Sequence, residues 1–454
     1  MEEVLKQYPK PVGLEKIQFD HVPIFSVVGL QLSMFQEPWS HGVPVVVTHI
    51  DSVFQGNWGP AYFIESYGSR PVVVQDCETE TTRNTTVKDF FMNFGISDRR
   101  SSILKLKDWP PQKAFSTEFP ELFKAFIDAV PCPDLARLDG VLNLAAHFPL
   151  NGLAPDLGPK MYNAFASPQD NEHHGSTKLH MDVTDAVNIM LWAASNHDGK
   201  AGSALWHIFP ASSVAVLRNF LREHGFTALG DPIHSQSMYL TPGLLDLLAT
   251  YGVRPYVIHQ HPGQAVFIPA GCPHQVSNEV DAIKIACDFL SINNVRETQE
   301  VVSQLRYQRL QSGFGDDVLQ FFTTLWYTWK SLSHMSELVA VPDIFIVGGD
   351  THSEPPATSE DILAEEQENA LSFDTLAITS PGTRQIHEIC SPTASHLTQG
   401  RDTLSHLEEK KKRRKEKKHA KAHSQRPQKP GFDFTCPIPH CAGYYHRAGL
   451  LDHL

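Results

Sequence analysis

Residues 177–188 read Thr-Lys-Leu-His-Met-Asp-Val-Thr-Asp-Ala-Val-Asn, and residues 266–276 read Val-Phe-Ile-Pro-Ala-Gly-Cys-Pro-His-Gln-Val. The first stretch contains His180 and Asp182, and the second contains His274. Two imidazoles and one carboxylate on one face of a metal ion leave its other coordination positions open, as in non-haem Fe(II) oxygenases. We therefore predict that these three side chains bind one iron ion.

The short pattern His-x-Asp/Glu is weak by itself. With 24 His and 51 Asp and Glu in 454 residues, about 2.7 occurrences are expected by chance. The chain has four, which begin at His49, His180, His352 and His406. The last two lie in polar sequence without apolar alternation, so we predict no pocket there. His49 ends an apolar run that predicts a buried strand, and no second histidine hairpin is placed to complete a site.

Alternation along residues 179–191 distinguishes the pattern at His180. Side chains of an extended chain point alternately to two faces, so a strand here would have the candidate ligands on one face and apolar side chains on the other. The segment around His274 predicts two strands joined by a Pro-Ala-Gly-Cys-Pro turn that directs His274 inward. The apolar face would hold Leu179, Met181, Val183, Val187, Ile189 and Leu191, and the other face His180, Asp182, Thr184, Ala186, Asn188 and Met190.

Lys284 lies in the apolar run Ala282-Ile283-Lys284-Ile285-Ala286-Cys287. A lysine in such a strand is seldom buried without a counter-charge. An even spacing from His274 places it on the same face if the strand is unbroken. A surface lysine whose stem covers apolar neighbours, or a salt bridge, explains the residue equally well when it is considered alone. Next to a metal site, we predict that Lys284 binds the distal carboxylate of 2-oxoglutarate, with hydrogen bonds from Thr177 and Asn188.

Longer stretches of the chain resemble one known family. They are Asp108-Trp109-Pro110-Pro111, Leu142-Asn143-Leu144-Ala145, residues 155–164, Ala204-Leu205-Trp206-His207-Ile208 and Asp231-Pro232-Ile233-His234, together with the two stretches quoted first. In this order they resemble the jumonji-C (JmjC) family, in particular its hairless/lysine-demethylase-3 group, over about residues 40–310.

The resemblance implies a mainly β fold with helices, a double-stranded β-helix or cupin-like jelly roll. It also implies Fe(II), 2-oxoglutarate and O2 as cofactors. The implied activity is histone lysine demethylation, typically at the mono- and dimethylated ninth lysine of histone H3, which releases formaldehyde and succinate. Lys178 departs from the family pattern, because relatives have an uncharged Asn beside the metal ligand.

Five regions are predicted along the chain. Residues 1–110 form an α/β brace of the barrel in which no chemistry shows, and residues 111–310 form the catalytic barrel. Residues 311–345 are helices that pack on the barrel, with Trp326 and Trp329 in the seam. Residues 346–430 are rich in Ser, Thr, Pro and Glu and are predicted to be disordered, because they bury too little apolar surface. Residues 431–454 resemble a partial Cys2His2 zinc finger with Cys436, Cys441 and His453 as zinc ligands.

Charge and cysteine content indicate the setting. Residues 401–430 hold twelve Lys and Arg and four Asp and Glu, which is a net charge of +8. Because the whole chain has a net charge of −13, the remaining residues carry −21. An acidic body favours encounter with a basic peptide such as a histone tail, although ordinary solubilising charge explains it equally well. The basic run 410–421 is typical of nuclear import, of DNA contact or of a solvated linker, and the JmjC resemblance favours import and thus a nuclear protein. Seven cysteines without a pairing ladder, and no apolar run of membrane-spanning length, predict a soluble intracellular protein with reduced thiols.

Two other functions stay open at this point. A protein hydroxylase would use the same triad and Lys284 on a side-chain carbon instead of an N-methyl group. A non-catalytic chromatin scaffold would bind histone without consuming cosubstrate, but it has no physical need of all four residues.

Overall fold

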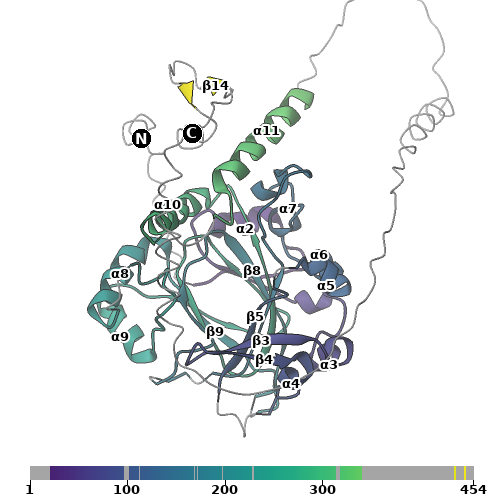
Figure 1. Cartoon of the computed structure of the whole chain (residues 1–454), viewed down its shortest axis with the longest axis vertical. Helices are drawn as coiled ribbons and strands as arrows, with labels where there is room; N and C mark the ends of the chain where they lie inside the picture. Colours follow the sequence, from purple (N-terminus) through teal and green to yellow (C-terminus); the bar gives the residue numbers. More distant parts are fainter. Residues whose placement is uncertain are drawn as a thin grey trace, which may run out of the picture. The chain divides into compact units, whose positions relative to one another are not determined.

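The protein is represented by a computed structural model that describes residues 21–96, 102–111, 113–167, 169–170, 172–196, 198–226, 230–312 and 317–339, and two short strands near the C-terminus. Two sheets form the main body (Figure 1). The larger has nine strands in the order β1-β2-β11-β8-β13-β6-β5-β3-β4, and the smaller has four in the order β10-β9-β12-β7. The strands of the two sheets are β1 (Ile24–Ser26), β2 (Val45–Thr48), β3 (Pro71–Asp76), β4 (Thr82–Thr86), β5 (Leu104–Trp109), β6 (Lys160–Ala164), β7 (Thr177–His180), β8 (Asp185–Ala193), β9 (Ala204–Ile208), β10 (Tyr256–Gln260), β11 (Ala265–Ile268), β12 (His274–Asn278) and β13 (Ala282–Phe289).

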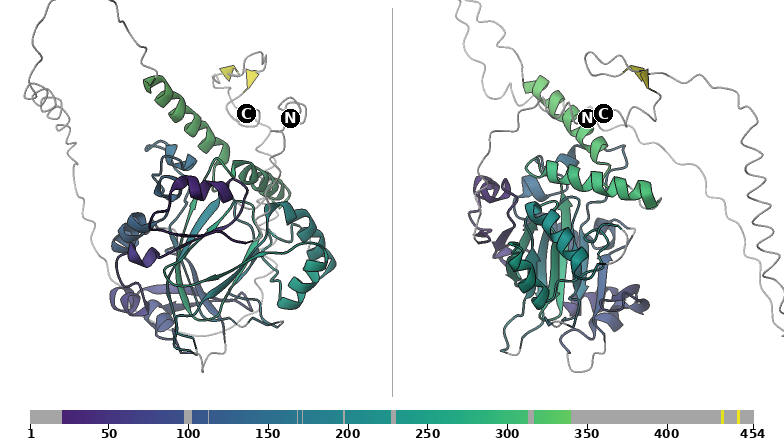
Figure 2. Two further views of the ribbon diagram at one scale, coloured as in Figure 1. Left: turned by 180° about the vertical axis from the view of Figure 1, so that it is seen from behind. Right: turned by 90° about the vertical axis from the view of Figure 1, so that its left-hand side faces the viewer.

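Helices cover the outer faces of both sheets (Figures 1 and 2). Those before β6 lie against the large sheet, whereas α8 and α9 lie beside the small one. They are α2 (Leu32–Trp39), α3 (Pro60–Tyr67), α4 (Val87–Phe91), α5 (Phe115–Glu118), α6 (Pro120–Ala129), α7 (Pro133–Ala136), α8 (Val214–Glu223), α9 (Pro242–Thr250), α10 (Val295–Ser312) and α11 (Phe321–Val339), with the 3-10 turns η1 (Ile50–Ser52), η2 (Leu144–His147) and η3 (Ala211–Ser213). The jelly-roll architecture that the resemblance implies is confirmed.

The chain changes sheets at both metal-ligand stretches. β7 belongs to the small sheet and β8 to the large one, with a turn over residues 181–184 between them. The prediction of one strand over 179–191 is therefore wrong, because the barrel can close only where the chain crosses from one sheet to the other. The predicted faces hold nevertheless. Leu179 and Met181 pack under α8, and Val187 and Ile189 pack on the outer face of the large sheet.

The core on the outer face of the large sheet is rich in aromatic rings. Phe63 of α3 contacts the rings of Phe91, Trp109 and Phe119 at centroid distances of 5.2 to 6.5 Å. Edge-to-face and offset contacts of this kind add to the free energy gained by burying each ring. This core fixes the sheet against which the interior of the barrel is built.

The N-terminal region is continuous with the barrel. β2 pairs with β11, and β5 pairs with β6, so strands from before residue 110 extend the large sheet at both ends. The mixed α/β character expected of residues 1–110 is present, with strands β1 to β5 and helices α2 to α4.

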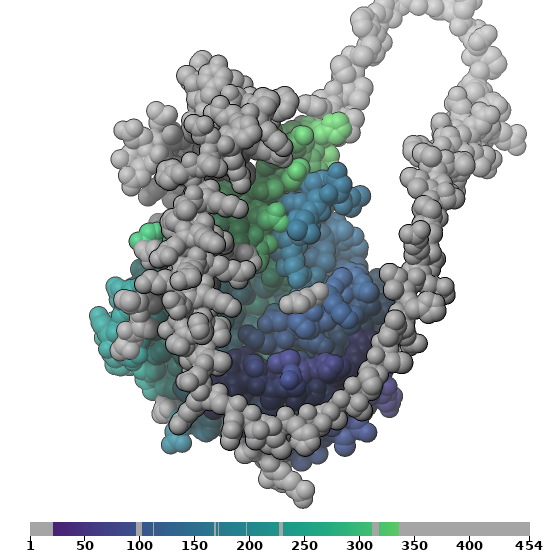
Figure 3. All heavy atoms as spheres, in the orientation of Figure 1, coloured from purple at the N-terminus to yellow at the C-terminus, as the bar shows by residue number. Residues whose placement is uncertain are grey.

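The helices after the barrel are present, but the two tryptophans are not in the seam. α11 packs through Phe321, Thr324 and Thr328, and the Thr328 hydroxyl donates to the Leu144 carbonyl. Trp326 and Trp329 are 43% and 60% exposed on another face of the helix and contact each other. In Figure 3 the spheres of α11 form part of the visible surface. Apolar spacing pointed to the wrong face of α11, because the face that packs carries Thr324 and Thr328 beside Phe321.

The leucine-rich helix α9 packs into the core. Leu248 is fully buried, and Leu244 and Leu245 pack against the same cluster under α8. Two short antiparallel strands, β14 (Phe434–Thr435) and β15 (Tyr444–Tyr445), belong to a separate C-terminal unit.

Candidate active site

His180, Asp182 and His274 meet inside the barrel. β7 and β12 are antiparallel neighbours, and His180 lies directly opposite His274. Their ring centroids are 4.2 Å apart. The Asp182 carboxylate contributes one oxygen 3.7 Å from His180 Nε2 and the other 3.6 Å from His274 Nε2. One ligand atom from each residue lies within 4.8 Å of the others, and no further cluster of this kind occurs in the described ranges.

Backbone carbonyls orient both imidazoles. His180 Nδ1 is 2.8 Å from the Lys178 carbonyl oxygen, and His274 Nδ1 is 3.0 Å from that of Cys272. A carbonyl can only accept, so each Nδ1 must carry the proton. The lone pair of each Nε2 therefore points to the common centre, which is the form in which histidine binds a metal.

The two rings differ in exposure. The His274 side chain is 4% exposed, whereas that of His180 is 17% exposed. Burial, and then the neighbouring His180, lowers the pKa of His274 to about 4. The ring is thus neutral at physiological pH and ready to act as a ligand.

A buried carboxylate holds the two ligand turns together. Asp185 accepts hydrogen bonds from the Ala270 and Ser291 backbone amides and from the Asn294 side chain. The Gly271 amide donates to the Asp182 carbonyl, and Gly271 has a φ of +72°, where glycine is favoured. Burial raises the pKa of Asp185 to about 6 despite these bonds. The Pro-Ala-Gly-Cys-Pro turn is thereby tied to the loop that presents Asp182.

A cavity of about 490 Å³ lies beside His180 and Asp182, which form part of its wall. Its volume is in the range of sites for small ligands. Charged and polar side chains dominate its wall, and they come from the strands of both sheets. The lining residues are Gln75, Cys77, Glu80, Lys105, Lys107, Asp108, Tyr162, Asn163, Ala164, Gly175, Ser176, Thr177, Lys178, His180, Asp182, Ser235, Gln236, Asn278 and Lys284.

Lys284 lies in this cavity, as predicted, although the strand that was expected to carry it there is interrupted. His274 is on β12 of the small sheet, and Lys284 is on β13 of the large one. Residues 279–281 join the two strands, and the even spacing still directs both side chains inward. Lys284 Nζ donates to Asn278 Oδ1 at 2.9 Å. Burial lowers its pKa to about 7.

The two other predicted cosubstrate contacts are placed differently. Thr177 lines the cavity on the same strand as His180. Asn188 is buried on β8, where its side-chain oxygen lies 3.4 Å from Gln260 Nε2, and it does not line the cavity of the described structure.

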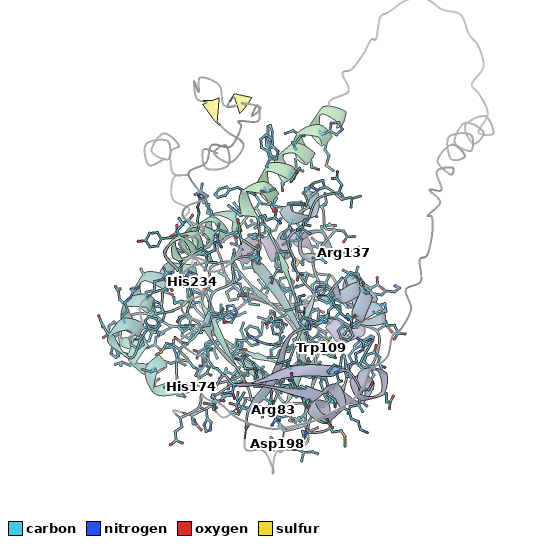
Figure 4. All side chains as sticks on the ribbon, in the orientation of Figure 1. Arg83, Trp109, Arg137, His174, Asp198 and His234 are labelled. Atoms are coloured by element: carbon cyan, nitrogen blue, oxygen red, sulfur yellow. The ribbon has the colours of Figure 1, made fainter. Side chains whose placement is uncertain are left out.

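The N-terminal strands contribute to the cavity wall, contrary to the expectation that this region carries no chemistry. Lys105 on β5 donates to the Ser176 carbonyl, and Glu80 after β3 pairs with Lys178. Glu78 pairs with His174, which is labelled in Figure 4. No single-strand pattern marks these residues, because they reach the site only when β5 pairs with β6.

Two more wall residues escaped the sequence analysis. Asn278 lies four residues after His274 on the same strand face, so strand alternation could have found it. Tyr162 is opposite Lys284 in the pairing of β6 with β13. Burial, and then the carboxylates of Asp108, Asp288 and Asp182, raises the pKa of Tyr162 well above its usual value.

The remaining sequence candidates lie elsewhere. His49 is outside the barrel cavity, has a φ of +62° and hydrogen-bonds to Thr48. His352, His406 and the zinc candidates Cys436, Cys441 and His453 lie outside the described residues, as does the basic run 410–421.

Residues 172–289 match the family described as "JmjC domain, hydroxylase". This protein contains a JmjC domain. The matched segment contains both histidines, the aspartate and Lys284, so the JmjC resemblance seen in the sequence is confirmed.

The JmjC protein is similar to several lysine demethylases. It is 35% identical over 344 residues to lysine-specific demethylase 3A-A of Xenopus laevis, covering 66% of this chain and 26% of the relative. It is 34% identical over 343 residues to human lysine-specific demethylase 3A, with the same coverage. A human protein named probable JmjC domain-containing histone demethylation protein 2C is 30% identical over 344 residues, which cover 66% of this chain and 14% of that protein.

The JmjC chain thus spans about a quarter of the length of the first two relatives. Among the described residues, no helix is both long and apolar enough to cross a membrane.

Proposed function

We propose that this JmjC protein is an Fe(II)- and 2-oxoglutarate-dependent oxygenase that demethylates lysine in a histone tail. One observation carries the proposal: His180, Asp182 and His274 share one centre, and His180, Asp182 and the buried Lys284 line the cavity beside it. A purely structural role explains these four polar side chains less well than the oxygenase function does, because burying them without a ligand costs free energy.

The donor set fits iron. His180, Asp182 and His274 would hold the ion from one side, and their Nε2 and carboxylate atoms already face a common centre. Three protein ligands leave room for two cosubstrate atoms and O2. When bound with 2-oxoglutarate and O2, the iron supplies the oxidation of a C–H bond.

The chain's own residues would bind and orient the cosubstrate. Lys284 would pair with the distal carboxylate of 2-oxoglutarate, and Thr177 would donate a hydroxyl hydrogen bond from the neighbouring wall. The position of Asn188 gives its proposed contact less support, since its side chain faces Gln260. A charge-assisted hydrogen bond to a buried ammonium is a strong one, so Lys284 is expected to dominate affinity.

Acidic groups next to the metal ligands support a cationic substrate. Asp108 and Asp182 line the cavity together with Tyr162. Carboxylates and an aromatic ring together suit an alkylammonium group. Hydroxylation of an N-methyl group gives N-hydroxymethyl-lysine, which releases formaldehyde. Overall, methyl-lysine, 2-oxoglutarate and O2 give lysine, formaldehyde, succinate and CO2. From the names of the relatives and the resemblance, we propose mono- and dimethylated ninth lysine of histone H3 as the substrate.

The C-terminal segments add three further proposals. The basic run 410–421 would direct the protein to the nucleus, where chromatin is, and would contact DNA phosphates. Cys436, Cys441 and His453 would supply three zinc ligands.

The function is tested in two steps with the full chain. Anaerobic titration with Fe(II) and 2-oxoglutarate measures assembly of the site, and mass spectrometry of mono- and dimethylated histone H3 peptides after O2 is admitted measures demethylation. We expect a loss of 14 mass units per methyl group and one formaldehyde per methyl lost, values that follow from the stoichiometry. His180→Ala should abolish both, whereas His49→Ala, at a second His-x-Asp pattern outside the cavity, should change neither.

The outcomes separate the alternatives. Succinate formation without mass loss from any methylated peptide, but with a gain of one oxygen on a protein substrate, would identify a hydroxylase. Histone binding without binding of Fe(II) or 2-oxoglutarate would identify a non-catalytic scaffold and overturn the proposal.

A further inference from the structure

Trp206 on β9 lies between the metal ligands and Lys284. Its ring centroid is 6.0 Å from that of His274, and the two planes are inclined by 28°. Lys284 Nζ lies 5.3 Å from the centroid of the same indole. Trp206 is itself buried and is not one of the cavity's lining residues. One buried side chain therefore contacts both ends of the proposed cosubstrate site, His274 at one end and Lys284 at the other.

Buried hydrogen bonds fix the orientation of this indole. Trp206 Nε1 donates to Gln260 Oε1 at 2.9 Å. Gln260 is fully buried, and its Nε2 donates to the carbonyl oxygens of Asn188 and Gln264. β9 is held on both sides, since Trp206 pairs with Ile258 of β10 and with Val276 of β12. The ring has little freedom to turn away from Lys284.

The ammonium of Lys284 has few other partners. No carboxylate of the described residues forms an ion pair with it, and Asn278 supplies a neutral oxygen. Tyr162 of β6 and Met190 of β8 are its strand-pair neighbours, and Tyr162 is neutral. The other charged or titratable groups that face the cavity are Lys105, Lys107, Lys178, Glu80, Asp108, Asp182, His180 and Cys77, and His274 lies across the indole.

An indole face attracts a cation through its quadrupole, and the attraction is larger where water is excluded. Trp206 thus compensates part of the desolvation of the Lys284 ammonium. Because the same ring packs on His274, it also sets where that ammonium lies relative to the metal ligands. The separation matters, because 2-oxoglutarate would have to reach both with one short carbon chain.

We propose that Trp206, oriented by Gln260, is a positioning residue that holds the Lys284 ammonium in register with the metal ligands and so sets the affinity for 2-oxoglutarate. This inference rests on the proposed function. It concerns a residue that does not itself contact the metal or the cosubstrate.

The test is calorimetric binding of 2-oxoglutarate to the full chain loaded with Mn(II), which takes the place of Fe(II) and does not react with O2. Trp206→Leu keeps bulk but removes the π face, and should weaken binding by about 5- to 30-fold. Trp206→Phe keeps an aromatic ring, so the logarithm of its loss of affinity should be about half that of Trp206→Leu. Gln260→Leu should weaken binding two- to fivefold, by order of magnitude, because only the orientation of the ring is released.

A matched control separates positioning from general damage to the fold. Trp192→Leu removes an indole from β8 that packs against Phe94 on the other face of the large sheet. It should lower thermal stability but leave 2-oxoglutarate affinity unchanged. Mn(II) affinity, measured on each variant before 2-oxoglutarate is added, should fall by less than threefold in Trp206→Leu, because the Nδ1 bonds that orient the histidines remain.

The pH profile gives a readout that a purely structural role would not move. Binding of 2-oxoglutarate should weaken as the pH rises through the pKa of the free Lys284 ammonium. Without the indole the ammonium is less favoured, so the midpoint should move to lower pH in Trp206→Leu and stay in place in Trp192→Leu.

The results that overturn the inference are distinct from failure of the proposed function. If the wild-type protein with Mn(II) binds no 2-oxoglutarate, the proposed function fails. If it binds and Trp206→Leu binds equally well with the same pH midpoint, the positioning role is wrong. Should Trp206→Leu fail to fold, unchanged affinity in both Trp206→Phe and Gln260→Leu would reject it.

Discussion

The two faces of the nine-stranded sheet are built from the same strands but have opposite characters. On β6, Tyr162 and Ala164 line the cavity, while Met161 packs in the outer core with its strand partner Ile285. The inner face gathers ionisable groups at a cost in stability, and the outer face gathers aromatic rings that offset that cost. The difference teaches that function and stability are divided here by strand alternation, one residue at a time.

The largest effect is expected from the inner face at the metal ligands. His274→Ala should reduce Mn(II) affinity by at least about 100-fold, the upper range found when only a supporting residue of a metal site is lost. The barrel should remain folded, since the substitution removes a polar group. Mn(II) binding measures the loss of metal affinity, and thermal unfolding of the same sample shows whether the barrel remains folded. A large loss of stability without loss of metal affinity would contradict the division between the faces.

On the outer face, Phe63→Ala should destabilise the protein by about 3–5 kcal/mol, the cost of emptying a buried phenylalanine site. Phe63 is fully buried among Phe91, Trp109 and Phe119. Denaturant unfolding measures the change. At a temperature where the variant is still folded, its affinity for 2-oxoglutarate should equal that of the wild type.

Lys284→Met should weaken 2-oxoglutarate binding by about 10- to 100-fold, because one charge-assisted hydrogen bond is lost. It should also change the pH dependence of stability. Burial lowers the Lys284 pKa from 10.5 to about 7, so between these values the unfolded chain binds a proton that the folded chain does not. The Lys284 contribution to stability therefore rises with pH between about 7 and 10.5, by up to about 1.4 kcal/mol per unit.

Urea unfolding of the protein without metal or 2-oxoglutarate at pH 7 and pH 9 checks this sign. The difference between wild type and Lys284→Met should be smaller at pH 9 than at pH 7, with the methionine variant more stable at pH 7. An equal difference at the two pH values would mean that Lys284 is not desolvated in the folded protein.

The smallest effect is expected at Asn163, which lines the cavity but has cross-strand partners, Leu106 and Ile283, that belong to the outer core. Neither polar atom of its buried side chain has a hydrogen-bond partner among the described residues. Asn163→Val should therefore stabilise the protein by about 1 kcal/mol, since the desolvation cost disappears and a branched side chain suits a strand. Thermal unfolding measures the gain. A loss of 2-oxoglutarate affinity in this variant would show that Asn163 serves the cavity and not the outer core.

Much of the site could be predicted from local sequence, because its key residues follow a period of two. The alternation of side chains along the strands was enough to place His180, Asp182, His274 and Lys284 on inner faces. This alternation stayed in phase across two interruptions of the strands, at residues 181–184 and 279–281. The turn before His274 was predictable from its prolines and glycine.

Other features needed contacts between distant segments. Lys105, Glu80 and Tyr162 reach the cavity only through the pairing of β5 with β6 and of β6 with β13. The exposure of Trp326 and Trp329 depends on which side of α11 meets the barrel. Asn188 has the predicted inward parity, yet its side chain meets Gln260 and not the cavity.

The amino-acid order by itself determined which side chains point inward along each strand, since backbone geometry forces alternation whatever the rest of the chain does. It therefore specified the metal ligands and the buried lysine. Only the tertiary structure decided which inward side chains become neighbours, because register and strand order depend on the packing of whole sheets. The indole that links His274 to Lys284, and the N-terminal wall of the cavity, exist for that reason alone.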